Sequence, residues 1–199
     1  KPDVTVTGDG FVAGEVSDIK ATGSATFVDD GEVTNAITFT TGEKFNEKNY
    51  TITKDEGKLS ITKRTDIIVI TTPTRSRAYN GKKLLDYSCT YTGTIADGDE
   101  LIMTFPEDDG LINAGSKPNQ YERYRVERKS DGKDVTNNYT FGESIIGTLT
   151  VTPVAIELTA GSASKAYDGT PLTSSDYTIT KGAFVDGEGL AAVTIAGSQ

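Results

Sequence analysis

Short stretches in which apolar and polar residues alternate recur along the chain, bounded by Gly, Asp and Asn. Threonine is frequent at the polar positions, which suits the solvent face of a half-buried strand. Because no window of about 11 residues has a clear 3.6-residue period, we expect an all-β fold with at most one short helical turn. The alternating positions that predict strands are Val4 and Val6, Ile37 and Phe39, Leu59 and Ile61, Leu101, Met103 and Phe105, Leu149 and Val151, and Val193 and Ile195.

Comparison of the chain with itself shows three copies of one pattern, with a period of about 90 residues. Glycines, tyrosines and apolar positions keep their order in each copy. The first copy aligns with the second at Gly14 and Gly98, Gly31 and Gly115, Asn35 and Asn119, Asn49-Tyr50 and Asn138-Tyr139, Gly57 and Gly147, and at residues 59–62 and 149–152. The second aligns with the third at residues 78–81 and 166–169, Leu84 and Leu172, and Asp97-Gly98 and Asp186-Gly187, and Gly14-Glu15 aligns with Gly187-Glu188.

These repeats predict three tandem β-rich modules. We expect one complete module over residues 64–153, a partial module over 1–63 that lacks the opening of the pattern, and a partial module over 154–199 that lacks its close. The second copy carries a few extra residues, which we place at a hairpin over 129–132 because insertions are tolerated at hairpin tips. The junctions contain neither a Gly/Ser tract nor a run of prolines, so we expect the modules to be joined stiffly.

Each module opens with a β-branched run followed by Tyr-(Asn/Asp)-Gly. Asn-Gly and Asp-Gly are favoured in tight turns because both residues tolerate a positive φ. We expect Tyr79 and Tyr167 to pack over that turn; the alternative is an exposed role in stacking on a ligand. The close of each module, Asn-Tyr-Thr followed by Gly-x-Leu-x-(Ile/Val)-Thr, predicts a strand, a turn and a final strand.

Composition excludes several classes of function. The 199 residues carry 20 Lys+Arg against 29 Asp+Glu, and this net charge of −9 opposes binding to nucleic acid or to anionic lipid. No run reaches the roughly 18 apolar residues that cross a bilayer. With no His and one Cys, the chain lacks the residues for a Ser-His-Asp triad, a zinc site of His or paired Cys, or an intrachain disulfide. We expect Cys89 to be a buried small apolar residue, and we expect no enzyme activity and no cofactor.

Several motifs resemble one family. They are Tyr-Asp-Gly-Thr-Pro-Leu-Thr at 167–173, Asp-Gly-Lys-Asp-Val-Thr-Asn-Asn-Tyr at 131–139, Glu-Lys-Asn-Tyr at 47–50 and Gly-Thr-Leu-Thr-Val-Thr at 147–152. In this order they resemble the YDG/MBG-type tandem repeats of bacterial cell-surface proteins and adhesins, although Tyr79-Asn80-Gly81 departs from the Asp-Gly form and lacks the following proline.

This resemblance covers essentially the whole chain. It implies an immunoglobulin-like sandwich or a β-grasp-like fold. It also implies a non-enzymatic stalk or spacer role in an exported protein at the bacterial cell surface or cell wall, with no catalytic residues to carry over. An isopeptide bond of the kind found in surface β-domains would need a Lys and an Asn or Asp, and the sequence does not assign the pair.

Acidic turns offer one alternative site. Clustered carboxylates could supply the six to eight oxygen ligands that Ca²⁺ takes, but the 12-residue spacing of an EF-hand is absent, so we expect solvated turns. The candidate calcium ligands are Asp97, Asp99, Glu100, Asp108 and Asp109. A glycosidase with paired carboxylates is disfavoured because the acids lie in turn-like strings and the chain has no Trp to line a sugar cleft.

A second alternative is an adhesin module that recognises a host glycan or protein. Tyr121, Arg123, Tyr124 and Arg125 form the densest mixture of aromatic residues and arginines, and both types are enriched at interfaces. The structural interpretation of the same residues is a strand with a Tyr/Val inner face and an Arg/Glu outer face.

The partial modules also predict self-association. The opening strand that residues 1–63 lack is present in the third copy. We therefore expect residues 155–159 to pair with residues 1–63 of a neighbouring molecule by strand donation, or less favourably with those of the same chain. Head-to-tail donation would give open chains or rings.

Overall fold

The computed structural model describes residues 4–196 and is all-β, as the alternation predicts. Three short 3₁₀ turns, at Val28–Asp30 (η1), Glu47–Asn49 (η2) and Thr136–Asn138 (η3), interrupt the strands, so the expectation of at most one helical turn is wrong. A three-residue turn is too short to leave a hydrophobic period in the sequence. Local hydrogen bonds form these turns instead, as when the Asn46 side chain accepts from the Lys48 amide.

The chain forms two compact units. The first comprises Lys1–Val69, Thr92–Ile102 and Arg125–Gly142, and the second comprises Ile70–Tyr91, Met103–Tyr124 and Glu143–Gln199. These limits do not follow the repeat boundaries, so the division into modules 1–63, 64–153 and 154–199 stays a prediction.

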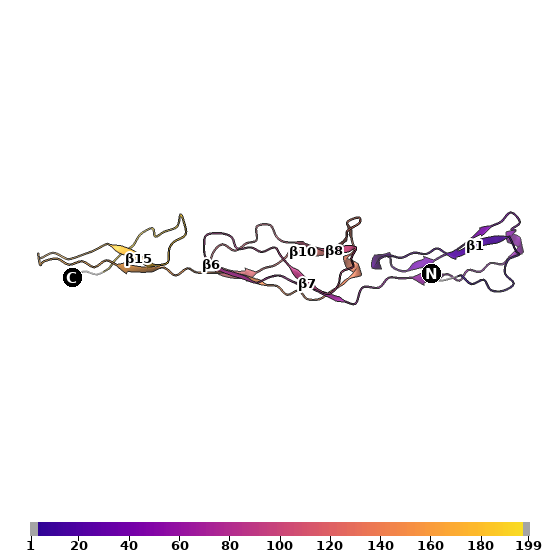
Figure 1. Cartoon of the computed structure of the whole chain (residues 1–199), viewed down its shortest axis with the longest axis horizontal. Helices are drawn as coiled ribbons and strands as arrows, with labels where there is room; N and C mark the ends of the chain where they lie inside the picture. The colour runs from indigo at the N-terminus through magenta and orange to yellow at the C-terminus, as the bar shows by residue number, and fades with distance from the viewer. Residues whose placement is uncertain (1–3, 197–199) are drawn as a thin grey trace. The chain divides into compact units, whose positions relative to one another are not determined.

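Two small antiparallel sheets belong to the first unit. Strand β1 (Val16–Ala21) pairs with β3 (Ile37–Thr41), and β2 (Val33–Asn35) pairs with β4 (Gly57–Leu59) (Figure 1). The β1–β3 register is irregular between Ser17 and Lys20, where Asp18 has a φ of 51°. The irregularity lies on β1, opposite the strand that the alternation of Ile37 and Phe39 predicts.

Two three-stranded sheets are formed by strands between residues 67 and 141, and part of each sheet belongs to the first unit. One has the order β12-β5-β7, and the other has the order β11-β10-β8. The β10–β11 hairpin turns through residues 129–132, where the sequence places the insertion. The bounds are β5 Ile67–Thr71, β7 Thr90–Thr92, β8 Asp99–Thr104, β10 Arg123–Arg128, β11 Lys133–Asp134 and β12 Thr140–Phe141.

The core of the first unit is formed by side chains that point inward from strands on which buried and exposed residues alternate. On β5, Ile68 is fully buried, whereas its neighbour Ile67 is 53% exposed. Ile68 packs with Val126, Val135 and Tyr139, and these four buried residues form one cluster. Partly buried side chains cover the cluster, namely Phe27, Ile95, Leu101 and Phe141.

In the second unit, β13 (Thr148–Thr152) lies between β6 (Arg75–Ala78), which is parallel to it, and β9 (Gly115–Pro118), which is antiparallel (Figure 1). Gly147 precedes β13, and a Cβ there would lie 2.3 Å from the Pro73 carbonyl, so only glycine fits. The buried Thr72 hydroxyl accepts the Gly147 amide at 2.9 Å. The last two strands, β14 (Glu157–Ala160) and β15 (Tyr177–Lys181), pair antiparallel.

Most of the predicted strands form. The alternation at 37–39, 101–103 and 149–151 lies in β3, β8 and β13, and Leu59 ends β4. Val4 and Val6 lie outside any strand, and so do Val193 and Ile195. Alternation shows only that a segment suits one face of a sheet. It does not supply the second segment whose backbone must pair with it.

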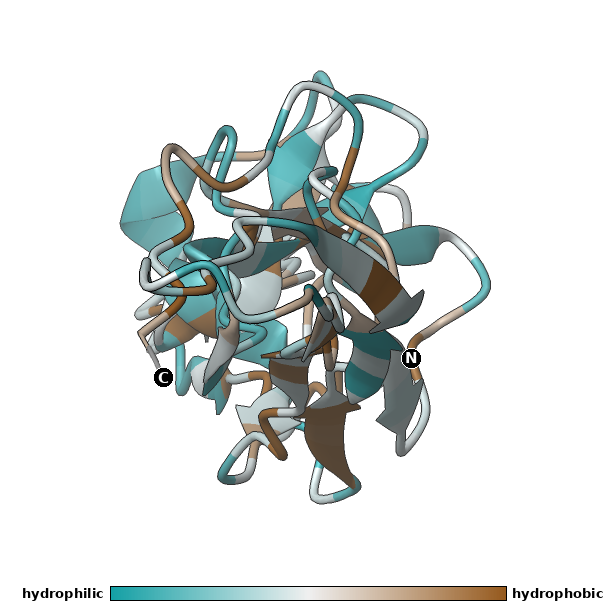
Figure 2. Ribbon diagram, turned by 90° about the vertical axis from the view of Figure 1, so that its left-hand side faces the viewer, coloured by the Kyte–Doolittle hydropathy of each residue, from teal (hydrophilic) through white to brown (hydrophobic). Residues whose placement is uncertain are grey.

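Hydrophobic and hydrophilic residues are interspersed along the strands, as Figure 2 shows. Among residues 4–196, no helix has the length and apolar character that a membrane span requires.

Candidate functional site

Tyr139, a buried core residue, makes two hydrogen bonds through its hydroxyl. Its hydroxyl donates to the Asp99 carboxylate at 2.5 Å and accepts from the Ala96 amide at 3.2 Å. Only 3% of Tyr139 is exposed. Burial, together with the bond to Asp99, raises the pKa of the Tyr139 hydroxyl. The phenol therefore stays protonated and ties two turns of the chain together.

Tyr50 makes the same pair of bonds in the first copy. Its hydroxyl donates to the Glu15 carboxylate and accepts from the Val12 amide at 3.1 Å. The bond to Glu15 raises the pKa of Tyr50. The sequence alignment already pairs Tyr50 with Tyr139. It did not identify the acidic partner, although an acid follows glycine in every copy, at Gly14-Glu15, Gly98-Asp99 and Gly187-Glu188.

Three of the five candidate calcium ligands use their carboxylates in contacts within the protein. Asp99 binds Tyr139, Asp108 pairs with Lys83, and Asp109 pairs with Lys117. The Asp97 carbonyl accepts from Lys129 at 3.0 Å, and Glu100 is exposed. Over residues 4–196 no three acidic or cysteine side chains gather as a metal would require.

The aromatic and arginine strand segment makes contacts within the protein. The rings of Tyr121 and Tyr124 meet edge-to-face, with centroids 5.9 Å apart, and the Tyr121 hydroxyl lies 2.7 Å from the Ser144 hydroxyl. Burial raises the pKa of Tyr124, with a smaller contribution from Tyr121. Arg125 donates to the Glu127 carboxylate at 2.6 Å, whereas Arg123 is exposed.

Cys89 is half-buried, and its thiol carries no disulfide. Burial raises the pKa of this thiol. Because the thiolate is the reactive form, the raised pKa lowers the reactivity of Cys89 at neutral pH.

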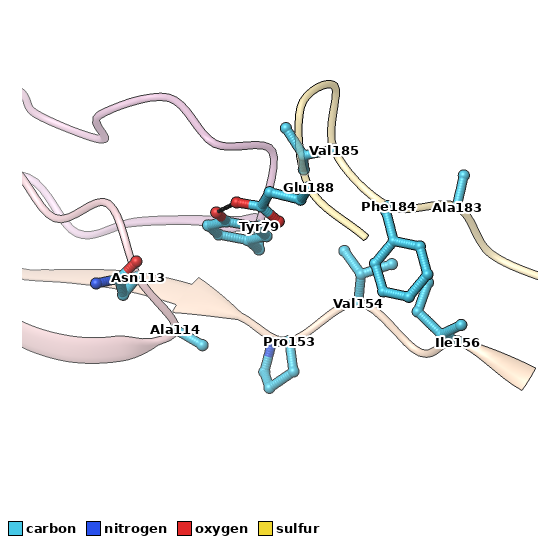
Figure 3. Close-up of a pocket in the computed structure, with 10 residues that line it drawn as sticks. All are labelled: Tyr79, Asn113, Ala114, Pro153, Val154, Ile156, Ala183, Phe184, Val185 and Glu188. Atoms are coloured by element: carbon cyan, nitrogen blue, oxygen red, sulfur yellow. Dashed lines mark hydrogen bonds between the residues drawn. The ribbon is translucent and has the colours of Figure 1, made fainter. Parts of the chain in front are cut away.

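A pocket of about 310 Å³ lies in the second unit (Figure 3). Its apolar wall includes Phe184, which lies beside Val154 and Ile156 in the close-up. The Tyr79 hydroxyl donates to Glu188 at the pocket, and this bond raises the pKa of Tyr79. The lining residues are Tyr79, Asn113, Ala114, Pro153, Val154, Ile156, Ala183, Phe184, Val185 and Glu188.

Sequence reasoning did not predict this pocket. Glu188 is the single carboxylate among the described lining residues, and Tyr79 engages it. General acid–base chemistry of the glycosidase type needs two carboxylates in one site. The pocket is thus suited to an apolar group.

Tyr79 and Tyr167, the tyrosines of the two Tyr-(Asn/Asp)-Gly motifs, differ in how exposed they are. Tyr79 is half-buried, and its amide donates at 2.8 Å to the carbonyl of Thr152, the last residue of β13. Tyr167 is 97% exposed, so the expectation that it packs over its turn is wrong. The reason is that no strand equivalent to β13 lies beside residues 163–167 among the described residues.

No family model matches the chain, and no curated protein or solved structure matches it either. The resemblance to YDG/MBG-type repeats therefore rests on the motifs alone.

Proposed function

We propose that these residues are non-enzymatic structural modules that act as a stalk or spacer in an exported bacterial surface protein. The observation that carries the proposal is the recurrence of one hydrogen-bond arrangement, in Tyr50 with Glu15 and in Tyr139 with Asp99. A spacer needs each copy to fold, and it does not need any copy to recognise a ligand.

The ionisable side chains support this proposal. The carboxylates of Asp99, Asp108 and Asp109 in the acidic turns are bound by tyrosine or lysine, and the one cysteine has a raised thiol pKa. A catalytic acid or nucleophile needs a free group with a pKa near the working pH. The chain is proposed to lie outside the cell, at the surface or in the wall, with neighbouring modules of the same protein as its partners and without a cofactor.

The adhesin alternative depends on the strand segment with Tyr121 and Tyr124. The contacts that Tyr121 makes with Ser144 and Arg125 makes with Glu127 favour a structural role. Arg123 is exposed, whereas Arg125, whose side chain is 40% exposed, pairs with Glu127. A host-contact site would therefore depend most on Arg123.

Glycan and host-protein arrays test the spacer proposal. We expect no specific binding by the full chain. Binding that is lost in Arg123→Ala and Tyr124→Ala, but kept in Tyr91→Ala as a matched exposed-tyrosine control, would contradict the spacer role. Thermal melts of each variant would separate loss of a contact from loss of fold.

A further inference from the structure

A short loop of the first repeat, residues 26–30, contacts the second repeat. The loop contains the turn η1, and this turn lies against η3 of the second repeat. Both segments belong to the first compact unit, although Val28 and Asn138, which are hydrogen-bonded there, are 110 positions apart in the sequence. The two repeats are therefore joined by a second route, in addition to the chain that connects them.

Phe27 supplies the apolar part of this contact. Its side chain packs against the buried core cluster, which consists of Ile68, Val126, Val135 and Tyr139. All four cluster residues lie in the second repeat, so an aromatic side chain of one repeat covers the core of the next. Aromatic side chains dominate the energetics of cores and interfaces. Phe27 is thus the residue on which the contact depends most.

Two cationic side chains of the β10–β11 hairpin lie over the Phe27 ring. The Lys133 Nζ is 3.7 Å from the ring centroid, and the Arg128 Cζ is 4.7 Å from it. Both distances are within the roughly 6 Å over which a ring face attracts a cation. The Asp131 carboxylate accepts from the Arg128 Nε at 2.8 Å and from the Lys133 amide at 3.2 Å. It thereby fixes the turn from which both cations project.

Hydrogen bonds hold the loop beside these cations. The Val28 amide donates to the Asn138 side-chain oxygen at 2.8 Å, and the Asn137 side-chain amide donates to the Asp29 carboxylate. The Asn138 carbonyl also accepts from the Arg64 amide at 2.9 Å. Because Arg64 opens the second repeat, Asn138 holds both the loop and the connecting chain.

The loop is preorganised for this contact. The Asp30 carboxylate accepts from the Thr26 amide at 2.7 Å and from the Phe27 amide at 2.9 Å, and these bonds lower the pKa of Asp30. The Gly31 amide closes the turn by donating to the Val28 carbonyl at 3.1 Å. A segment that already has its bound conformation loses less entropy when it docks.

The aligned segment of the second repeat lacks these features. Residues 27–30 read Phe-Val-Asp-Asp, whereas the aligned residues 111–114 read Leu-Ile-Asn-Ala. Leu111 has no ring face to attract a cation, and Ala114 has no carboxylate to accept amides as Asp30 does. The chemistry that fits the β10–β11 hairpin and η3 is therefore peculiar to the loop of the first repeat.

We infer that residues 26–30 lock the first repeat onto the second. The surface that receives the loop, called the socket below, consists of Arg128, Lys133, Asn137 and Asn138. Tandem domains move relative to each other unless contacts between them oppose the motion. The loop and the connecting chain are two separate attachments, so together they restrain bending and twisting at this joint. The lock does not depend on the spacer role.

NMR of the full chain tests the contact directly. The ring current of Phe27 should shift the side-chain methylene protons of Lys133 upfield, and Phe27→Leu should return them to the values of an unstructured lysine. Lys54 lies 5.1 Å from the centroid of the Phe39 ring, so its methylene protons are a matched control that Phe27→Leu should leave unchanged. Unshifted Lys133 protons in the unaltered chain, or a shift that survives Phe27→Leu, would overturn the lock.

Nitrogen-15 relaxation tests whether the contact stiffens the joint. We expect residues 16–21 and 125–128 to tumble together in the unaltered chain. Replacing residues 27–30 by Leu-Ile-Asn-Ala, the sequence of the second repeat, should shorten the correlation time of residues 16–21 relative to that of 125–128. Glu32→Ala removes an exposed acid outside the loop and should change neither value.

The amide shifts of β1 and β3 separate loss of the lock from loss of fold, since only unfolding changes them toward random-coil values. Independent tumbling of the two segments in the unaltered chain would contradict the inference. So would joint tumbling that persists after the loop is replaced.

Discussion

The Tyr139 hydroxyl donates a 2.5 Å hydrogen bond to the carboxylate of Asp99, 40 residues earlier in the chain. Tyr139→Phe keeps the ring and leaves both Asp99 and the Ala96 amide without this partner. We expect the substitution to destabilise the fold by about 1–3 kcal/mol, the cost of an unsatisfied part-buried group. The midpoint of urea unfolding measures this change.

The matched variant is Tyr50→Phe, which removes the same bonds from the first copy. Tyr50 is less buried than Tyr139, so water can replace its hydroxyl and the effect should be smaller. An unchanged midpoint in Tyr139→Phe would show that the repeated bond does not stabilise the copies.

Two neighbouring isoleucines test the core. Ile68→Ala should cost about 2–5 kcal/mol because it opens a cavity at a fully buried site. Ile67→Ala, on the exposed face of the same strand, should change stability by less than about 0.5 kcal/mol. Equal losses in the two variants, measured by chemical denaturation, would contradict the assignment of faces on β5.

The hairpin over 129–132 should respond to acid. Hydrogen bonding to the Arg128 side chain lowers the pKa of Asp131 from 3.8 to about 2. Because the pKa is lower in the folded state, the charged carboxylate stabilises the hairpin above pH 3.8, and this contribution is lost as the pH falls toward 2.

An NMR titration of the Asp131 carboxyl measures this pKa directly. Arg128→Gln should return it toward 3.8. A pKa already near 3.8 in the unaltered chain would show that the Arg128–Asp131 pair does not form in solution.

Calcium should have no effect on stability. Asp108 and Asp109 pair with lysines, and Asp99 accepts from Tyr139. Melts with Ca²⁺ and with a chelator should therefore coincide. A specific ion present at 100 times its Kd would add about 2.7 kcal/mol. A rise of several degrees that Asp99→Asn removes would place a calcium site in the turns.

Part of the fold follows from the sequence because alternation within one short segment indicates a half-buried strand. Alternation at Leu149 and Val151 predicts β13, and both side chains are buried. Alternation at Val193 and Ile195 predicts a strand that does not form, since pairing depends on a second segment that periodicity cannot identify. The 3₁₀ turns are closed by local backbone hydrogen bonds, such as that from the Gly31 amide to the Val28 carbonyl, and they span too few residues to leave a periodic pattern.

The candidate site was less predictable. The Tyr-Asn-Gly motif predicts a turn at Tyr79, but the bond from Tyr79 to Glu188 joins residues 109 positions apart. A repeat alignment marks both residues as recurring and says nothing of which recurring positions meet. The same limit applies to Tyr139 and Asp99. Both lie at aligned positions, and only the folded chain shows that they are bonded.

The spacer role is tested most directly by measuring how far the chain holds an attached tag from the cell wall. One, two and three copies of the full chain would be inserted between a cell-wall anchor and a peptide tag, and localisation microscopy would measure the distance from tag to wall. Stiff modules predict a distance that grows in proportion to the number of copies. Growth with the square root of chain length, as a Gly/Ser linker of equal residue number would show, or no growth at all, would contradict the account.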